Sequence, residues 1–95
     1  DYIHTHVIIL QALGMAGKDL MSQFPNNWKT KIKNLKKINW LKNNPEWHQR
    51  VIVNGRVVKN SNSIILAANL IKKALGARLS VKEKALESKM KKNVK

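Results

Sequence analysis

Basic side chains are the residues of this chain best suited to chemistry, and the chemistry they suit is ion pairing with phosphate. The 95 residues contain 19 Lys and Arg but five Asp and Glu, giving a net charge of +14. No acid occurs between Asp19 and Glu46, or between Glu46 and Glu83. Such an excess attracts polyanions through salt-dependent interactions. Because 16 of the 19 cations are Lys, a point charge, the pattern favours non-specific phosphate contact over base-edge reading by Arg.

The densest group of these cations lies in the segment 27–38. Its lysines recur at helical spacing one position after an apolar stripe, so we expect them on an adjoining, outward face. Later basic residues, including an adjacent pair of lysines, extend the set. The predicted nucleic-acid-contacting residues are Lys29, Lys33, Lys36, Lys37, Lys42, Arg56, Lys59, Lys72 and Lys73.

Other residue types give no support for metal binding or catalysis within this segment. His4 and His6 are the closest pair of potential metal ligands, but a spacing of two places them about 200° apart on a helix, and the chain has no Cys. His48 has no visible partner. The five acids are scattered and form no acid/base pair, and no Ser has the context of a nucleophile elbow. We therefore expect no metal, no cofactor and no enzyme active site in this segment.

Two further motifs have a structural and a functional interpretation. Gly14 to Lys18 superficially resembles a phosphate-binding loop, but it lacks the Walker A spacing, and close helix packing at Gly14 and Gly17 is the favoured interpretation. Aromatic residues among lysines can stack bases. However, Trp28 belongs to an apolar stripe, and Trp40 and Trp47 flank a polar turn that they could enclose by packing on each other. Structural roles are favoured for all three.

The size and composition fit one domain. Apolar residues make up 43% of the chain, enough for a modest core. The longest apolar runs fall far short of the roughly 20 residues that span a bilayer. The chain begins at Asp1 without a signal-peptide pattern, so we interpret it as a piece of a longer protein.

The periodicity predicts a mainly α fold, a compact bundle of four or five short helices. A core domain over residues 1–79 contains helices at about 3–22, 27–38 and 63–75. Asn27 is the expected N-cap of the second helix. The third is apolar on nearly every side and should be central, with Gly76 just past its end. Ser80 and Glu83 form a capping box that opens a basic C-terminal helix or tail over 80–95, which we expect to pack loosely.

Residues 44–59 allow two interpretations. Val51–Val53 and Val57–Val58 flank Asn54–Gly55, a strong signal for a β-hairpin near 51–58. Alternatively, Asn44 caps a helix that has Pro45 at its first position. The two are nearly balanced, with a slight preference for a short helix from Pro45 that gives way to extended chain.

Short motifs along the chain resemble a bacterial family. They are Leu10–Gly14, Ile38–Trp40, Asn44–Trp47, Asn54–Ser61 and Ile71–Gly76. Over residues 8–84 the chain resembles the C-terminal part of the DndB family of DNA sulfur modification proteins, which carry a DGQHR motif. That motif is absent here. The resemblance implies a cytoplasmic protein associated with regulation of the phosphorothioation system, including transcription regulation, and not with the sulfur chemistry. It transfers no catalytic residue to this chain.

Two functions are therefore open. In the first, the segment is a basic accessory domain whose lysines contact the DNA backbone. In the second, it is a packing module in which the apolar helix 63–75 meets the rest of the parent chain or a second copy, as a homo-oligomer, and the lysines only maintain solubility. Neither function requires a membrane.

Overall fold

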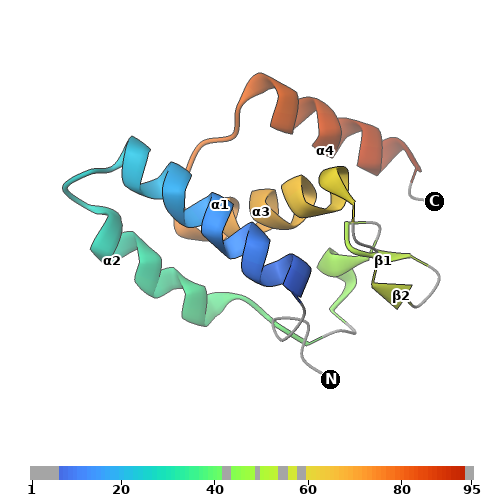
Figure 1. Ribbon diagram of the computed structural model, residues 1–95, viewed down its shortest axis with the longest axis horizontal. Coiled ribbons are helices and arrows are strands. Elements are labelled where there is room, and N and C mark those ends of the chain that lie inside the picture. Colours follow the sequence, from blue (N-terminus) through green and yellow to red (C-terminus); the bar gives the residue numbers. More distant parts are fainter. Residues whose placement is uncertain (1–6, 42–43, 49, 54–55, 58–59, 94–95) are drawn as a thin grey trace.

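The computed structural model describes residues 7–41, 44–48, 50–53, 56–57 and 60–93, and they form the mainly helical fold that the periodicity predicts (Figure 1). The molecule measures 40 × 30 × 19 Å along its principal axes. A short antiparallel strand pair accompanies the helices. The elements are α1 (Val7–Gln23), α2 (Trp28–Ile32), the 3-10 helices η2 (Lys33–Lys37) and η3 (Pro45–Trp47), β1 (Ile52–Val53), β2 (Arg56–Val57), α3 (Ser61–Leu75) and α4 (Val81–Asn93).

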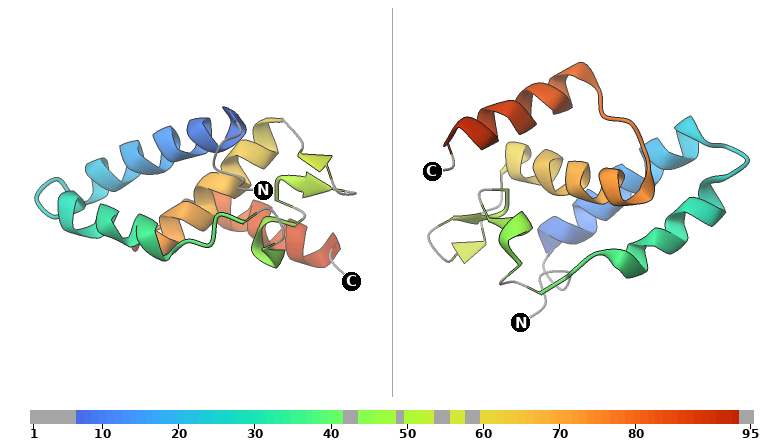
Figure 2. Two further views of the ribbon diagram at one scale, coloured as in Figure 1. Left: turned by 90° about the horizontal axis from the view of Figure 1, so that it is seen from below. Right: turned by 180° about the vertical axis from the view of Figure 1, so that it is seen from behind.

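Helix α3 is the centre of the fold, as its apolar composition predicts. Figure 2 shows it between α4 on one side and the α1–α2 pair on the other. Helix α1 packs on α3 through small and branched side chains at helical spacing, among them Ile8, Ala12 and Ala16, all fully buried. They meet Ala67 and Ile71 within one hydrophobic core. The alanines let the two helix backbones approach closely, and the branched side chains fill the remaining volume.

The ends of α3 are fixed by local sequence. The Asn60 side-chain oxygen accepts a hydrogen bond from the Ser63 N–H at 2.8 Å, which satisfies a free donor of the first turn. At the other end Gly76 has φ 83° and ψ 14°, a left-handed conformation that glycine adopts without a steric penalty. The predicted C-terminal glycine is confirmed.

Helix α1 corrects one expectation. Residues 3–6 of the predicted first helix lie outside the described residues, and the helix ends one residue later than predicted, at Gln23. The close helix packing predicted at Gly14 and Gly17 is wrong, because no atom outside the helix lies within 4 Å of the position a Cβ would occupy at either. Ala12 and Ala16 make the close approach to the core instead.

The predicted second helix is divided in two. Its first part, α2, is an ordinary helix, whereas its second part, η2, winds as a 3-10 helix until Ile38 turns extended. 3-10 turns are frequent at the C-terminal ends of α-helices. Asn27 is the N-cap residue of α2, as predicted, but its side chain makes no capping hydrogen bond. The apolar stripe of this segment consists of Trp28, Ile32 and Leu35, and all three pack, half-buried, against the core.

The segment 44–59 contains both predicted kinds of structure, one after the other along the chain. Asn44 caps η3 by accepting a hydrogen bond from the Glu46 N–H at 3.2 Å, with Pro45 at the first position. The chain then becomes extended, and β1 pairs antiparallel with β2 in the register Ile52↔Val57 and Val53↔Arg56. The turn at 54–55 lies outside the described residues.

Candidate nucleic-acid interface

The lysines of the α2–η2 segment are presented to solvent as predicted. Lys29, Lys33, Lys36 and Lys37 are all exposed, and the half-buried Trp28 and its stripe hold the segment on the core. In a 3-10 helix, residues three apart lie directly above one another, so Lys33 and Lys36 follow one line along the surface. Arg56 on β2 is also exposed. Lys42 and Lys59, the remaining predicted contacts of this half, lie outside the described residues.

Lys72 corrects the predicted contact set. Its side chain is 0% exposed, and its ammonium group pairs with the carboxylates of Asp19 on α1 and Glu83 on α4. Burial opposes charge on Lys72, but the hydrogen bonds with the two carboxylates outweigh it and raise its pKa. Lys72 is therefore a structural cation that joins three helices, and it is unavailable to a phosphate at the surface.

Lys73, the next residue, lies at the surface. One step along a helix turns a side chain by about 100°, so adjacent residues face different environments. The Lys73 side chain is 46% exposed, and its Nζ lies 2.9 Å from Glu87 Oε1. The ion pair orients Lys73 without burying it, which leaves part of its ammonium group accessible to an anion.

Glu87 is the centre of a buried ion-pair network. Both of its oxygens accept hydrogen bonds from the Arg50 guanidinium, at 2.5 and 2.7 Å, and the same guanidinium donates to the Leu66 carbonyl. Asn69 Nδ2 lies 3.3 Å from Glu87 Oε2. Burial alone would raise the pKa of Glu87, but the bonds to Arg50 and Lys73 dominate and lower it to about 2. The carboxylate therefore stays charged at neutral pH.

This network changes the charge of the surface. Together with the two ion pairs of Lys72, it contains three cations, Arg50, Lys72 and Lys73, and three carboxylates, from Asp19, Glu83 and Glu87. Because the network is balanced, the net charge of +14 is carried by side chains outside it. Glu46 is the one further acid among the described residues. The basic residues of the surface therefore face almost no neutralising carboxylate.

The exposed cations are not confined to one element. In addition to the α2–η2 lysines, the described exposed lysines include Lys18 on α1 and Lys82, Lys84 and Lys89 on α4. Helices α2 and α4 lie at opposite edges of the molecule (Figures 1 and 2). The α2–η2 segment has the highest density of them, with Lys29, Lys33, Lys36 and Lys37 within nine residues.

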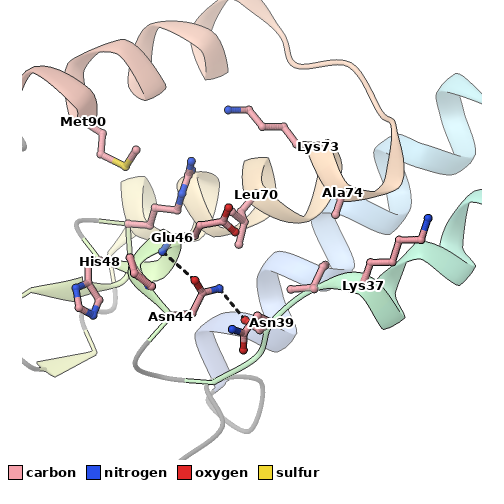
Figure 3. Close-up of a pocket in the computed structure, with 12 residues that line it drawn as sticks. Lys37, Asn39, Asn44, Glu46, His48, Leu70, Lys73, Ala74 and Met90 are labelled. Carbon is pink, nitrogen blue, oxygen red and sulfur yellow. Dashed lines mark hydrogen bonds between the residues drawn. The ribbon is translucent and has the colours of Figure 1, made fainter.

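A cleft of about 810 Å³ opens between η2, η3, α3 and α4 (Figure 3). Two of the predicted contact residues, Lys37 from η2 and Lys73 from α3, line it. Its polar lining also includes Asn39, Asn44, Glu46, His48 and Arg50, and its apolar lining includes Ile38, Pro45, Leu70, Ala74 and Met90. A second, smaller hollow of about 390 Å³ shares Lys73 and continues along α4 past Lys84.

The tryptophans have structural roles, as favoured from the sequence. The rings of Trp40 and Trp47 stack with centroids 5.8 Å apart and planes 24° from parallel. Trp47 is fully buried, and its indole N–H donates to the Asn39 carbonyl at 2.9 Å. Asn44 Nδ2 donates to the same carbonyl. The Trp47 and Asn44 side chains thus both bond the Asn39 carbonyl, and Asn39 and Asn44 line the cleft.

The histidines and acids give no metal site within the part of the chain that the structure describes. No cluster of three His, Asp or Glu side chains in ligand geometry occurs there. His48 is exposed and lines the cleft, whereas His4 and His6 lie outside the described residues. None of the described helices is long and apolar enough to cross a membrane.

Sequence reasoning missed the residues that carry the network. Arg50 and Glu87 are 37 positions apart, and no local pattern connects them. Glu83 was identified only as half of a capping box, which is confirmed: Ser80 N–H donates to Glu83 Oε1 at 2.7 Å, and Glu83 N–H donates to Ser80 Oγ at 3.2 Å. Burial alone would raise the pKa of Glu83, but the hydrogen bonds with Lys72 and then with Ser80 outweigh it and lower this pKa. The prediction that the C-terminal helix packs loosely did not anticipate the ion pairs that Glu83 and Glu87 make with Lys72 and Arg50.

Comparison with known proteins places the chain in a family. The family model DndB, described as DNA-sulfur modification-associated, matches residues 1–78. The chain therefore belongs to the DndB family of DNA-sulfur modification-associated proteins, as its motifs indicate. The match begins and ends earlier than the resemblance over 8–84, and α4 follows it. Searches of curated proteins and of solved structures return no match.

Proposed function

We propose that this segment is a non-catalytic accessory domain of a DNA-sulfur modification protein and that it contacts the DNA backbone without sequence specificity. Lys29, Lys33, Lys36 and Lys37 make the central contacts, and Arg56 on β2 and Lys73 on α3 make further ones. Membership of a DNA-sulfur modification-associated family supports DNA as the polyanion. By the same resemblance, the domain serves the regulation of the modification system in the cytoplasm and takes no part in the sulfur chemistry.

The observation that carries this proposal is the separation of charge inside the fold. Three of the four acids that the structure describes, Asp19, Glu83 and Glu87, each form an ion pair with a cation of α3 or with Arg50. The exposed lysines are thus left to attract external anions. An exposed lysine held near phosphate gains affinity chiefly by releasing condensed counterions, which requires no base contact.

The test is fluorescence anisotropy of a labelled duplex titrated with the protein at low salt. A variant with Lys29, Lys33, Lys36 and Lys37 changed to Gln is compared with a matched control that has Lys18, Lys82, Lys84 and Lys89 changed to Gln. Both variants lose four exposed lysines and therefore have the same net charge. We expect the first to lose most of its affinity, and the control to retain more.

Two results would contradict the proposal. The unmodified chain could fail to bind duplex DNA even at low salt, which would end it. Alternatively, the two variants could lose affinity equally, which would mean that total charge, and not the α2–η2 surface, determines binding.

A second candidate function, packing against another protein surface, is favoured by α1. The predicted packing helix, 63–75, is buried inside the fold and is unavailable. Instead Val7, Leu10 and Met21 of α1 are 60%, 57% and 48% exposed. They recur with Gly14 at spacings of three, four and seven, so they form one apolar stripe along the helix.

Light scattering separates this candidate from the first. A dimer that forms without DNA, is indifferent to added DNA and dissociates in a Leu10→Gln variant would support packing through α1. A monomer that binds duplex DNA would favour the accessory DNA-binding domain. A Val81→Gln variant is the matched control, because Val81 is an apolar residue that is 85% exposed but lies on α4.

A further inference from the structure

The cleft between η2 and α4 is chemically unlike the lysine-covered surface around it. It has an apolar floor and wall, to which Ile38, Leu70, Ala74 and Met90 contribute. It also reaches the buried layer of the molecule, since Leu70, Asn44 and Arg50 are all buried. Its volume of about 810 Å³ falls in the range of small-molecule sites, roughly 300–1,000 Å³. The phosphate backbone of a duplex has no apolar surface that could fill it.

The polar groups of the cleft are segregated. In the close-up, Lys37 and Lys73 lie on one side, and His48 and Met90 lie on the opposite side (Figure 3). Both lysines are exposed. His48 is also exposed and presents an aromatic ring at the other end of the cleft. The cleft therefore suits a ligand that has an anionic group at one end and a flat, partly apolar body at the other.

The charges that face the cleft are consistent with a single anionic group. Arg50 lines it, but Glu87 already engages both ends of the Arg50 guanidinium. Glu46 also lines the cleft, and its carboxylate opposes an anion placed close to it. Lys37 and the exposed part of Lys73, which also pairs with Glu87, are therefore the cations that face a phosphate, and they place it at their side of the cleft.

We propose that this cleft binds an unpaired nucleotide of single-stranded DNA, with its phosphate on Lys37 and Lys73 and its base against His48 and the apolar wall. Histidine is one of the aromatic side chains on which unpaired bases stack. Because every base has a flat face, this contact requires no particular nucleotide sequence. The inference rests on the proposed function, because it assigns the form of DNA to the same basic surface.

A comparison of single- and double-stranded DNA tests the inference. A purely electrostatic binder prefers duplex, because duplex has the higher charge density and releases more counterions per contact. A base held in the cleft reverses this preference, since stacking of one base contributes about 1–3 kcal/mol, which corresponds to about fivefold or more in affinity. We expect the full chain to bind a labelled single strand at least about fivefold more tightly than the duplex of the same sequence at equal salt.

Three variants locate the effect in the cleft. Ala74→Trp fills it and should abolish the preference for single strands while leaving duplex affinity unchanged. His48→Ala should reduce the preference and decides the matter if Ala74→Trp does not fold. Lys37→Gln should weaken single-strand binding more than Lys29→Gln does, because both lysines are exposed on the same segment but only Lys37 lines the cleft.

The outcomes also separate this inference from the proposed function. Duplex binding without any preference for single strands would overturn the cleft assignment and leave the backbone-binding domain intact. A preference that survives both Ala74→Trp and His48→Ala would also overturn it. The absence of binding to either form would overturn the proposed function itself.

Discussion

At the scale of single residues, the neighbours Lys72 and Lys73 show how position decides the role of a charge. Both were predicted to contact nucleic acid. One is fully enclosed by two carboxylates, whereas the other is half exposed and lines the cleft. A buried ion pair requires complete partners, because the loss of water around each charge must be offset by hydrogen bonds. The Glu87 carboxylate meets that requirement with two cations, Arg50 and Lys73, and the Asn69 amide.

Removal of the Glu87 charge should strongly destabilise the fold. A Glu87→Gln variant leaves Arg50 buried without its counter-charge, and breaking such a pair costs about 3–5 kcal/mol. We expect a loss of about that size in the free energy of unfolding, measured by urea denaturation. Glu46→Gln is the matched control, because Glu46 is exposed and its change should stay within about 0.5 kcal/mol. Equal stability of the two variants would show that the network does not hold the fold together.

The same carboxylate predicts the acid sensitivity of the chain. The pKa of Glu87 falls from 4.5 to about 2 on folding, and that of Glu83 is lowered as well. For a lowered carboxyl pKa, the stabilisation is fully present above the unfolded value and disappears as the pH falls through the folded value. Urea denaturation at several pH values should therefore show stability declining from about pH 5 towards pH 2. In Glu87→Gln this decline should be shallower; an unchanged decline would contradict the assignment.

At the scale of elements, substitution by Ala should have opposite effects on stability at Gly76 and at Gly14, because their backbone environments differ. Gly76 ends α3 with φ 83°, where any side chain is strained. Gly14 lies inside α1 with open space around it. Gly76→Ala should therefore destabilise the protein by about 1 kcal/mol, whereas Gly14→Ala should stabilise it by roughly 0.4–1 kcal/mol. Thermal unfolding of the pair checks both signs, and stabilisation by Gly76→Ala would contradict the described end of α3.

The elements that the sequence predicted well are those with local signals. The capping box at Ser80, the cluster of cap formers before α3 and the glycine after it each act within a few residues. Such signals operate on the chain alone, so they can be read before the fold is known. The mixed region 44–59 was predicted as two alternatives because it contains the signals of both a helical turn and a hairpin, and it forms both in succession.

The features that the sequence could not predict depend on distant residues. The close approach to α3 was assigned to the glycines of α1, yet alanines on the opposite face make it. The burial of Lys72 depends on Asp19 and Glu83, which lie on two other helices. The cleft combines residues from four elements. Composition gave the sign of the surface charge correctly, but only packing decides which lysines remain free.

At the scale of the whole molecule, α4 is part of the folded unit although it follows the matched residues 1–78. Its Glu83 and Glu87 neutralise the cations of α3 and Arg50, and its Met90 lines the cleft. A chain that ends before α4 would leave Lys72 and Arg50 with fewer counter-charges or none. The folded, basic domain that we describe therefore includes α4.

The salt dependence of duplex binding tests the central claim most directly. If about five phosphates are engaged by the α2–η2 lysines and their neighbours, log K against log salt concentration should have a slope of about −4 to −5. The variant with Lys29, Lys33, Lys36 and Lys37 changed to Gln should have a slope shallower by about 3 to 4. A slope near zero for the unmodified chain, or the same slope for the two proteins, would contradict the claim that these lysines bind the DNA backbone.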